Sequence, residues 1–188
     1  PDPDLAADMY TWAEDRLESA EYIHYEISNW SKPSLESQHN LIYWRNSSYL
    51  GVGPGAHSFL ANCRFANVKS PRTYMHQIQN WQGKYPLPIN AKTLSVTGAV
   101  ESVEVLDRGT EMGETLMMGL RLKEGVSLES FRARFEVDLA TLYEQVIREL
   151  GELALIEWHV GSLRLTRKGL LLGNEVFQRF LSASKEIH

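Results

Sequence analysis

A change of hydrophobic period near the start of the chain restricts its fold more than any other feature. Apolar residues recur every three or four positions from Leu5 to Leu17, which predicts an amphipathic helix. From Tyr22 to Ser28 apolar and polar residues alternate instead, which is the period of a strand with one apolar and one polar face. A helix followed at once by a strand indicates an α/β unit.

Helix-capping residues and turn residues predict the helices and strands between Ser37 and the linker at 86–88. Ser37 is expected to cap a short helix that ends at Trp44. After a turn at 46–48, a buried strand is expected over 49–52, opening into a glycine-rich loop over 53–58. A further helix is predicted over 70–81, and a linker rich in proline at 86–88 ends this half.

The second half is predicted to be mainly helical. Helices are expected over 101–122, over a short stretch capped by Ser127 and ending at Phe135, over 139–150 and over 168–181. Two short strands, 155–158 and 162–165, turn at Gly161 and make a small hairpin within about residues 153–166. Three helices, a hairpin and a closing helix are typical of a winged-helix-like module.

Composition excludes several classes of protein. The chain has 188 residues, of which 43% are hydrophobic and 23% charged, and these values are ordinary for a globular protein. No stretch approaches the roughly 18 apolar residues that a transmembrane helix needs. The net charge of −5 argues against a nucleic-acid binder that depends on phosphate contacts. A single cysteine, Cys63, excludes an internal disulfide and an iron–sulfur cluster held by this chain alone.

The start of the chain predicts that it is part of something larger. It begins at Pro1 without a methionine and runs at once into a helical pattern. No charged and then apolar leader opens it, so nothing points to secretion. We therefore expect the C-terminal part of a larger protein of the cytoplasm.

Aromatic and polar residues gather on the short helix before Trp44. His39 and Tyr43 lie four positions apart on one face, and Asn40 and Trp44 lie four apart on the neighbouring face. Such a group suits a flat aromatic ligand such as a porphyrin, whose iron a neutral imidazole can bind. Spacing alone favours an ordinary core histidine with two core aromatics.

The other candidate sites give weaker signals. The glycines at 51, 53 and 55 do not form a dinucleotide fingerprint, because the third comes too early. Glu26 and Ser28, on the polar face of the first strand with His24, are candidates for the interior of a barrel or for a solvated face. No nucleophile elbow, zinc-binding motif or local metal-ligand spacing is present, so neither catalytic nor metal-binding residues are predicted.

Five segments taken together resemble a known family. They are the segments 25–30, 39–45, 49–58, 114–122 and 165–169, which read YEISNW, HNLIYWR, YLGVGPGAHS, ETLMMGLRL and LTRKG. Their order and spacing resemble the second half of oxygen-independent coproporphyrinogen III oxidase-like radical SAM proteins. The block from His39 to Trp44 is similar to the heme-chaperone branch of that family.

This resemblance implies a fold and a function. Residues 1–84 would be the C-terminal strands and helices of an incomplete parallel (β/α) barrel, and residues 85–188 a mainly helical, winged-helix-like domain. Heme or a porphyrin would contact His39, Asn40, Tyr43 and Trp44, and S-adenosylmethionine would contact Gly53, Gly55, Ala56 and His57. The cysteines that bind the family's 4Fe–4S cluster are absent, so this chain cannot cleave S-adenosylmethionine by itself.

The resemblance leaves three functions to compare. The first is a protein that binds heme and delivers it to an acceptor protein, whose identity the sequence does not give. The second is oxidative decarboxylation of coproporphyrinogen III. The third is a winged-helix module that binds DNA, which the balanced charges after Gly151 disfavour. An isolated part of a barrel would also leave a strand edge unpaired, which favours association, for instance into a dimer.

Overall fold

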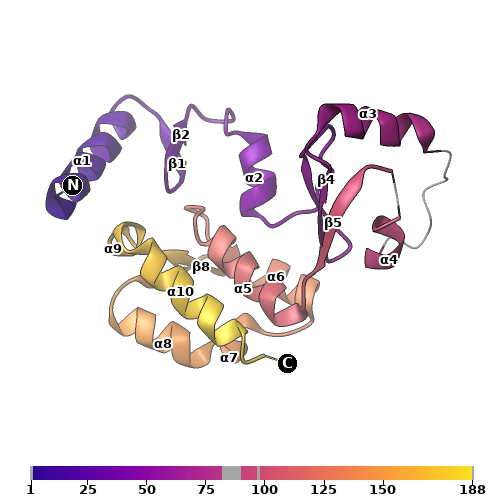
Figure 1. Cartoon of the computed structure of the whole chain (residues 1–188). Coiled ribbons are helices and arrows are strands. Elements are labelled where there is room, and N and C mark those ends of the chain that lie inside the picture. The colour runs from indigo at the N-terminus through magenta and orange to yellow at the C-terminus, as the bar shows by residue number, and fades with distance from the viewer. Residues whose placement is uncertain (1, 82–89, 97, 188) are drawn as a thin grey trace. The chain divides into compact units, whose positions relative to one another are not determined.

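The computed structural model describes residues 2–81, 90–96 and 98–187. The chain forms two compact units, which the ribbon colours help to follow (Figure 1). Unit 1 combines Pro1–Asn46 with Met112–His188, and unit 2 is the intervening segment Ser47–Glu111. The domain boundary predicted near residue 84 and the linker at 86–88 lie outside the described residues.

Unit 1 begins with a helix, a hairpin and a second helix. The side chain of Asp2 caps α1 (Pro3–Glu18) by accepting from the amides of Asp4 and Leu5. The strands β1 (Ile23–Glu26) and β2 (Asn29–Ser31) then pair antiparallel, with an irregularity in register between His24 and Glu26. Ser37 caps α2 (Gln38–Trp44), as predicted. The prediction of one strand through Ser28 is wrong, because the chain turns after Glu26.

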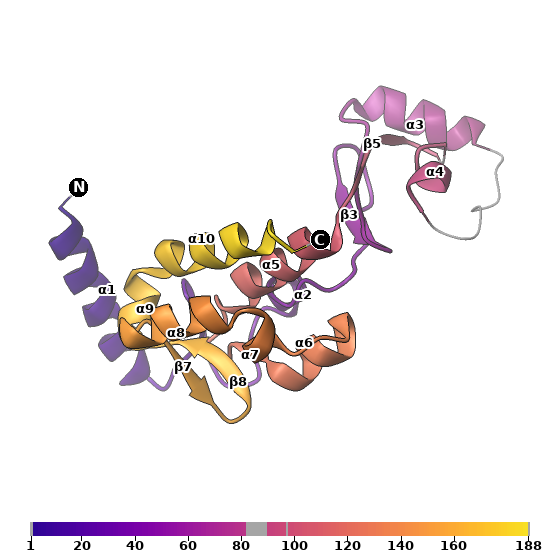
Figure 2. The ribbon, with the colours of Figure 1, turned by 90° about the horizontal axis from the view of Figure 1, so that it is seen from below.

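The remainder of unit 1 is a helical assembly with a small sheet. Its elements are α5 (Arg108–Gly119), which begins in unit 2, β6 (Val126–Ser127), α6 (Leu128–Phe135), α7 (Leu139–Leu142), α8 (Glu144–Glu152), β7 (Ile156–His159), β8 (Ser162–Leu165), α9 (Arg167–Leu171) and α10 (Gly173–Ser184). The sheet has the order β6-β8-β7 and is antiparallel, and β7 and β8 form the predicted hairpin (Figure 2).

One apolar cluster holds the helices and the sheet of unit 1 together. It includes Leu116 from α5, Leu120 just after that helix, Phe131 from α6, Leu163 from β8 and Phe180 from α10, all nearly or fully buried. The helix predicted over 139–150 is interrupted at Tyr143, whose backbone leaves the helical region between α7 and α8. The buried face nevertheless continues, since Leu139 and Leu150 both belong to the cluster.

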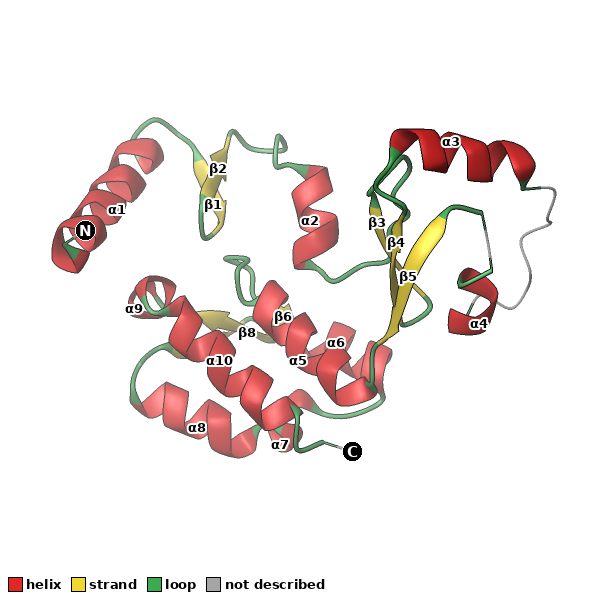
Figure 3. Ribbon diagram, in the orientation of Figure 1, coloured by secondary structure: helices red, strands yellow, loops and turns green. Residues whose placement is uncertain are grey.

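Unit 2 is a three-stranded sheet with two helices. The strands β3 (His57–Leu60), β4 (Cys63–Asn67) and β5 (Val100–Val105) lie in that order and pair antiparallel (Figure 3). The predicted helix after residue 70 is α3 (Pro71–Asn80), which Ser70 caps, and Asn90 caps α4 (Ala91–Leu94). The buried core of this unit contains Cys63, which is a free buried thiol.

Two predicted elements of unit 2 are wrong. The segment 49–52 is not a strand: Tyr49 makes an isolated bridge to Phe59, and the strand lies further on, at His57–Leu60. Residues 101–105 are a strand and not the start of a helix, which begins only at Arg108. The partner of β5 is β4, more than thirty residues earlier, and local periodicity carries no information about so distant a pairing.

The fold class is α/β, as predicted. Every strand pair in the described residues is antiparallel, and the sheets are small. The parallel barrel and the winged-helix assignment therefore stay predictions. None of the described helices is both long enough and apolar enough to cross a membrane.

Candidate functional site

The helix α2 is fixed in unit 1 by a buried side chain on one face and by hydrogen bonds and an ion pair at its two ends. Leu41 is buried, and the side chain of Ser37 accepts a hydrogen bond from the Asn40 amide at 3.4 Å. After the helix, Arg45 pairs with Glu124 at 3.1 Å, and the side chain of Asn46 donates to Thr115 at 3.0 Å. These contacts fix which side of α2 faces outward.

The outward side of α2 carries the first pair of predicted heme contacts. The rings of His39 and Tyr43 meet edge to face, with 4.9 Å between centroids and an angle of 87°. His39 is exposed and has no hydrogen-bond partner among the described residues. Ile42, one turn from His39, is 39% exposed and adds an apolar neighbour. The imidazole therefore has no competing hydrogen bond in the described part of the chain and lies against the Tyr43 ring.

The second predicted pair has a different environment. Trp44 is partly buried, and the guanidinium of Arg121 lies over its ring, 4.7 Å from the centroid. Its indole Nε1 is buried without a hydrogen-bond partner. Asn40 is partly buried and is placed by the cap of the helix. The structure thus brings His39 and Tyr43 into contact and holds Trp44 separately against Arg121.

Glu26 and Ser28 do not share one surface. Glu26 is fully buried, and its Oε1 accepts from the Ser28 amide at 3.1 Å and from the side chain of Asn29. Its Oε2 is buried without a partner. Ser28 is exposed in the turn that follows β1. The carboxylate of Glu26 therefore lies inside unit 1, whereas the hydroxyl of Ser28 lies outside.

A polar network between α1 and β1 was not predicted from the sequence. Nδ1 of His24 lies 3.2 Å from Oε1 of Glu14, and its Nε2 lies 3.2 Å from the carbonyl oxygen of Ile27. The hydroxyl of Tyr10 donates to the same carbonyl at 2.9 Å. Trp30 stacks on the imidazole with 4.2 Å between centroids. The spacing of Tyr10 and Glu14, four apart on one helix face, was the only signal available for it.

Burial and neighbouring charges shift the pKa values of two groups in this network, the Tyr10 hydroxyl and the Glu14 carboxyl. Burial, with smaller contributions from Glu14 and Glu26, raises the pKa of Tyr10 to about 12. Burial alone raises the pKa of Glu14, but Lys123, His24 and Arg167 outweigh it and hold the pKa below its ordinary value. Lys123 lies 3.5 Å and Arg167 3.1 Å from the Glu14 carboxylate. The carboxylate is thus ionised at neutral pH and joins α1 to β1 and α9.

The glycine-rich loop of unit 2 satisfies its own backbone. The amides of Gly51, Gly53 and Gly55 donate to the Ser58 hydroxyl at 2.9 Å, to the Tyr74 hydroxyl at 3.2 Å and to the Val68 carbonyl at 2.9 Å. Gly53 and Gly55 have positive φ, at 108° and 70°, so this turn favours glycine. A Cβ added at Gly53 would meet nothing within 4 Å.

The predicted S-adenosylmethionine contacts lie together in this loop. Ala56 is partly buried and His57, the first residue of β3, is exposed. A cavity of about 250 Å³ lies beside the loop, bordered by Gly51 and Val52 but not by the four predicted residues. With its amides already engaged, the loop can offer a ligand the open backbone surface at Gly53 but no cradle of free N–H groups.

The side chains of this chain fit some of the implied cofactors and not others. A 4Fe–4S cluster does not fit, because the sequence has one cysteine and that thiol is buried. Among residues 2–81, 90–96 and 98–187, no group of three or more His, Cys, Asp or Glu is placed to hold a metal ion. Heme fits better, since one imidazole can be sufficient to bind its iron and His39 is exposed and free.

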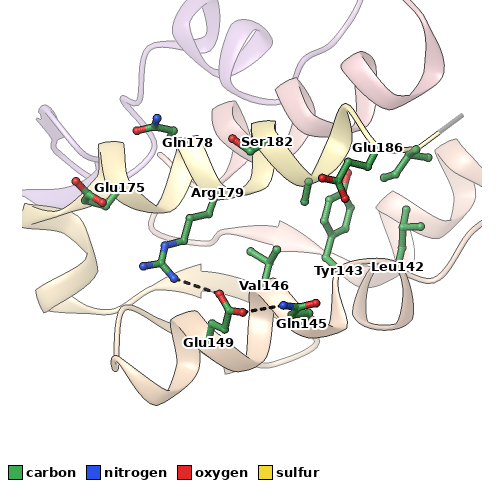
Figure 4. A pocket seen from close by; sticks show the side chains of 12 residues that line it. Leu142, Tyr143, Gln145, Val146, Glu149, Glu175, Gln178, Arg179, Ser182 and Glu186 are labelled. Carbon is green, nitrogen blue, oxygen red and sulfur yellow. Dashed lines mark hydrogen bonds and ion pairs between the residues drawn. The ribbon is translucent and has the colours of Figure 1, made fainter.

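A separate groove lies between α8 and α10 and contains none of the predicted residues. It has a volume of about 690 Å³, and Arg179 reaches across it toward Glu149 at 3.4 Å, beside Gln145 (Figure 4). Glu175 and Glu186 also line it. Its polar lining and its position distinguish it from the aromatic face of α2.

Comparisons with known proteins relate the chain to one family. Residues 106–172 match the family described as HemN C-terminal domain. Over 181 residues, the chain is 34% identical to a Lactococcus lactis protein and 35% identical to a Bacillus subtilis protein, both named heme chaperone HemW. These alignments cover 96% of this chain but 43% and 44% of the relatives.

A mitochondrial relative and a solved structure also match this chain. The chain is 30% identical over 192 residues to radical S-adenosyl methionine domain-containing protein 1 of Bos taurus, covering 99% of this chain and 41% of that protein. The structure of coproporphyrinogen III oxidase (HemN) from Escherichia coli, a radical SAM enzyme, matches with a TM-score of 0.63 and 16% identity over 96% of this chain and 42% of the other. The chain therefore spans less than half the length of the proteins it matches.

Proposed function

Because residues 106–172 match the HemN C-terminal domain family and nearly the whole chain is similar to proteins named heme chaperone HemW, we propose that the chain is the C-terminal part of such a protein and supplies the heme-binding face of a heme chaperone. The intact protein would bind heme and deliver it to an acceptor protein. The name heme chaperone belongs to the relatives that are 34% and 35% identical along nearly the whole chain. The coproporphyrinogen oxidase, at 16% identity, supports the fold alone.

The exposed imidazole of His39 is the observation that carries this proposal. It meets the Tyr43 ring edge to face, has no competing hydrogen bond in the described part of the chain, and has the apolar Ile42 one helical turn away. A neutral imidazole binds heme iron, and apolar and aromatic side chains cover the macrocycle. His39 would bind the iron, Tyr43 would hold the imidazole in orientation, and Asn40 and Trp44 would shape the border.

The open position of this face suits delivery better than storage. α2 is held by its buried face and its ends, so a ligand on its outward face can leave without unfolding the helix. A buried cofactor would instead be enclosed by the core. The position of His39 therefore fits a protein that receives heme and passes it on.

The intact protein would add the parts that this chain lacks. We propose that the segment up to about residue 84 supplies the last strands and helices of an incomplete parallel barrel and that the remainder is winged-helix-like. Leu5, Met9 and Trp12 support this, because they form an apolar stripe on α1 that is at least 57% exposed. The 4Fe–4S cluster would be held elsewhere in that protein, and Gly53, Gly55, Ala56 and His57 would border S-adenosylmethionine.

The remaining expectations about partners and setting stay predictions. They are the identity of the heme acceptor, association into a dimer, a cytoplasmic location and the lack of nucleic-acid binding. Oxidative decarboxylation of coproporphyrinogen III is less favoured, because the relatives with the higher identity carry the chaperone name.

A hemin titration followed by the Soret band tests the proposal. The chain should bind hemin saturably, and His39→Ala should weaken binding by about tenfold or more through loss of the iron ligand. His76→Ala is the matched control, because His76 is also an exposed histidine on a helix. We expect this control to bind hemin as the unaltered chain does.

Two results would contradict the proposal. One is hemin binding that is equal in His39→Ala and the unaltered chain, which would indicate non-specific adsorption or another ligand. The other is loss of binding in His76→Ala alone. Circular dichroism of each variant would show that the fold is retained.

A further inference from the structure

Arg121 lies between two aromatic rings just beyond the end of α5. Its guanidinium carbon is 4.7 Å from the centroid of Trp44 at the end of α2 and 5.7 Å from that of Phe177 in α10. A guanidinium between two rings is attracted to both faces and loses much of its freedom to rotate. Three elements of unit 1 thus hold one cation in place.

This cation has no anionic partner in the described part of the chain. Other arginines of unit 1 do pair with carboxylates: Arg45 with Glu124 at 3.1 Å, and Arg164 with Glu157 at 2.8 Å. Arg121 makes no such pair, and its Nε is buried without a hydrogen-bond acceptor. Its two terminal nitrogens are neither buried nor hydrogen-bonded there, so they reach solvent. The accessible end of the guanidinium is therefore a donor without an acceptor.

The backbone of Arg121 is fixed as firmly as its side chain. Its amide donates to Met118 at 3.1 Å, and its carbonyl accepts from the Ile27 amide at 2.9 Å. The next residue, Leu122, makes an isolated β-bridge with Glu26. Binding an anion would then cost little ordering, because main chain and side chain are already positioned.

A buried donor at Trp44 adds a second observation. Its indole Nε1 is buried without a partner, as is Nε of Arg121. Unpaired buried N–H groups are uncommon and cost free energy, so two on neighbouring side chains mark a point where the described residues leave donors unsatisfied. Planar guanidinium groups bind carboxylates with two parallel hydrogen bonds.

We propose that Arg121 is a carboxylate-binding residue that receives a propionate group of heme. This inference rests on the proposed function, because His39 and Trp44 belong to the same short helix. They are five residues apart, which places them about 7.5 Å apart along the helix axis and about 140° apart around it. A macrocycle bound at His39 would therefore extend past the C-terminal end of α2 for one of its propionates to reach Arg121. The guanidinium would select a tetrapyrrole that has free carboxylates.

The test compares hemin with its dimethyl ester, in which both carboxylates are neutral. The unaltered chain should bind hemin about tenfold or more tightly than the ester, since a charge-assisted pair is lost. Arg121→Gln should bind the two ligands equally, at the level of the ester. Arg121→Lys should recover part of the preference, because it keeps the charge but not the planar fork.

Arg148→Gln is the matched control. Arg148 is an exposed arginine in α8 without a described ion pair, so this variant loses the same net charge. It should keep the full preference for hemin over the ester. Thermal unfolding of each variant would show whether Arg121→Gln is folded, and Arg121→Lys keeps the test decisive if it is not.

The outcomes separate this inference from the proposed function. If His39→Ala weakens hemin binding but Arg121→Gln keeps the preference for hemin over the ester, the inference fails and the function stands. If the preference depends on Arg121 while His39→Ala has no effect, the carboxylate site stands and the proposed iron ligand fails.

A measurement without heme covers the remaining case. The side-chain Nε–Hε resonance of Arg121 can be followed by NMR while sodium propionate is added, with Arg148 as the internal reference. A saturable shift at Arg121 alone supports the site even if the chain binds no hemin. Equal or no shifts at the two arginines would overturn the inference.

Discussion

Glu14 is the residue whose charge joins the first helix to its surroundings. Burial alone raises the pKa of its carboxyl, but Lys123, His24 and Arg167 outweigh it and hold the pKa below its ordinary value of 4.5. A group with a lower pKa in the folded state than in the unfolded state stabilises the fold when it is ionised. This stabilisation is complete above the unfolded value and is lost as the pH falls through the folded value.

We therefore expect Glu14→Gln to lower the free energy of unfolding by about 1 kcal/mol at neutral pH. The difference from the unaltered chain should shrink as the pH falls below 4.5, because Glu14 itself then becomes protonated. Urea unfolding at a series of pH values measures this. Glu18→Gln, at the exposed C-terminal end of the same helix, is the control and should cause no loss of stability. A loss that stays constant with pH would mean that packing and not charge is responsible.

Sequence predicts single residues well only where their partners are near in the chain. The contact of His39 with Tyr43 follows from their spacing of four on one helix. The position of Arg121 does not follow from any local pattern, because its ring partners come from α2 and α10. The motif from 114 to 122 contained this arginine, yet only the fold shows that it lacks an anion.

At the scale of elements, the same limit decides which predictions failed. Ser37, Ser70 and Ser127 mark helix starts correctly, because a cap is a contact between residues three apart. β5 was predicted as helix, although its valines at 100, 103 and 105 are typical of strands. Its pairing with β4, more than thirty residues earlier, settles the outcome. Hydrophobic periodicity does not predict which strands pair when they lie far apart in the sequence.

Helix packing predicts that replacing glycine by alanine lowers the free energy of unfolding at Gly113 and raises it at Gly151. A Cβ added at Gly113 in α5 would lie 2.5 Å from the hydroxyl oxygen and 2.7 Å from the Cβ of Ser184 in α10. Ser184 is itself held, because its hydroxyl donates to the Phe180 carbonyl at 2.7 Å. Gly113→Ala should therefore destabilise the chain by about 1–3 kcal/mol, although alanine is the better helix former.

Gly151 in α8 is the matched position. A Cβ there meets nothing within 4 Å, and its φ is not positive. Gly151→Ala should raise the free energy of unfolding by roughly 0.5–1 kcal/mol through helix propensity alone. Thermal or urea unfolding of both variants measures the pair. Stabilisation by Gly113→Ala would show that α5 and α10 can move apart at little cost.

At the scale of the whole molecule, the two units differ in the size of their cores. Among the described residues, the buried cluster of unit 1 joins α5, α6, α8, α10 and the sheet β6-β8-β7. The buried cluster of unit 2 consists of Cys63, Phe65 and Leu94, with a few partly buried neighbours. Local stability follows the amount of buried apolar surface. We therefore expect unit 2 to open more often than unit 1.

Native-state hydrogen exchange tests this with a matched pair of strands. β4 and β8 are each the central strand of a three-stranded antiparallel sheet, and β4 is paired along more of its length, so pairing alone would protect β4 at least as well as β8. The amides of β4 should exchange about tenfold or more faster than those of β8, because the smaller core opens at a lower free energy. Equal protection of the two strands would contradict this and would show that both units unfold as one cooperative body. Faster exchange in β4 would instead mean that the glycine-rich loop can rearrange while the face of α2 that carries His39 stays folded.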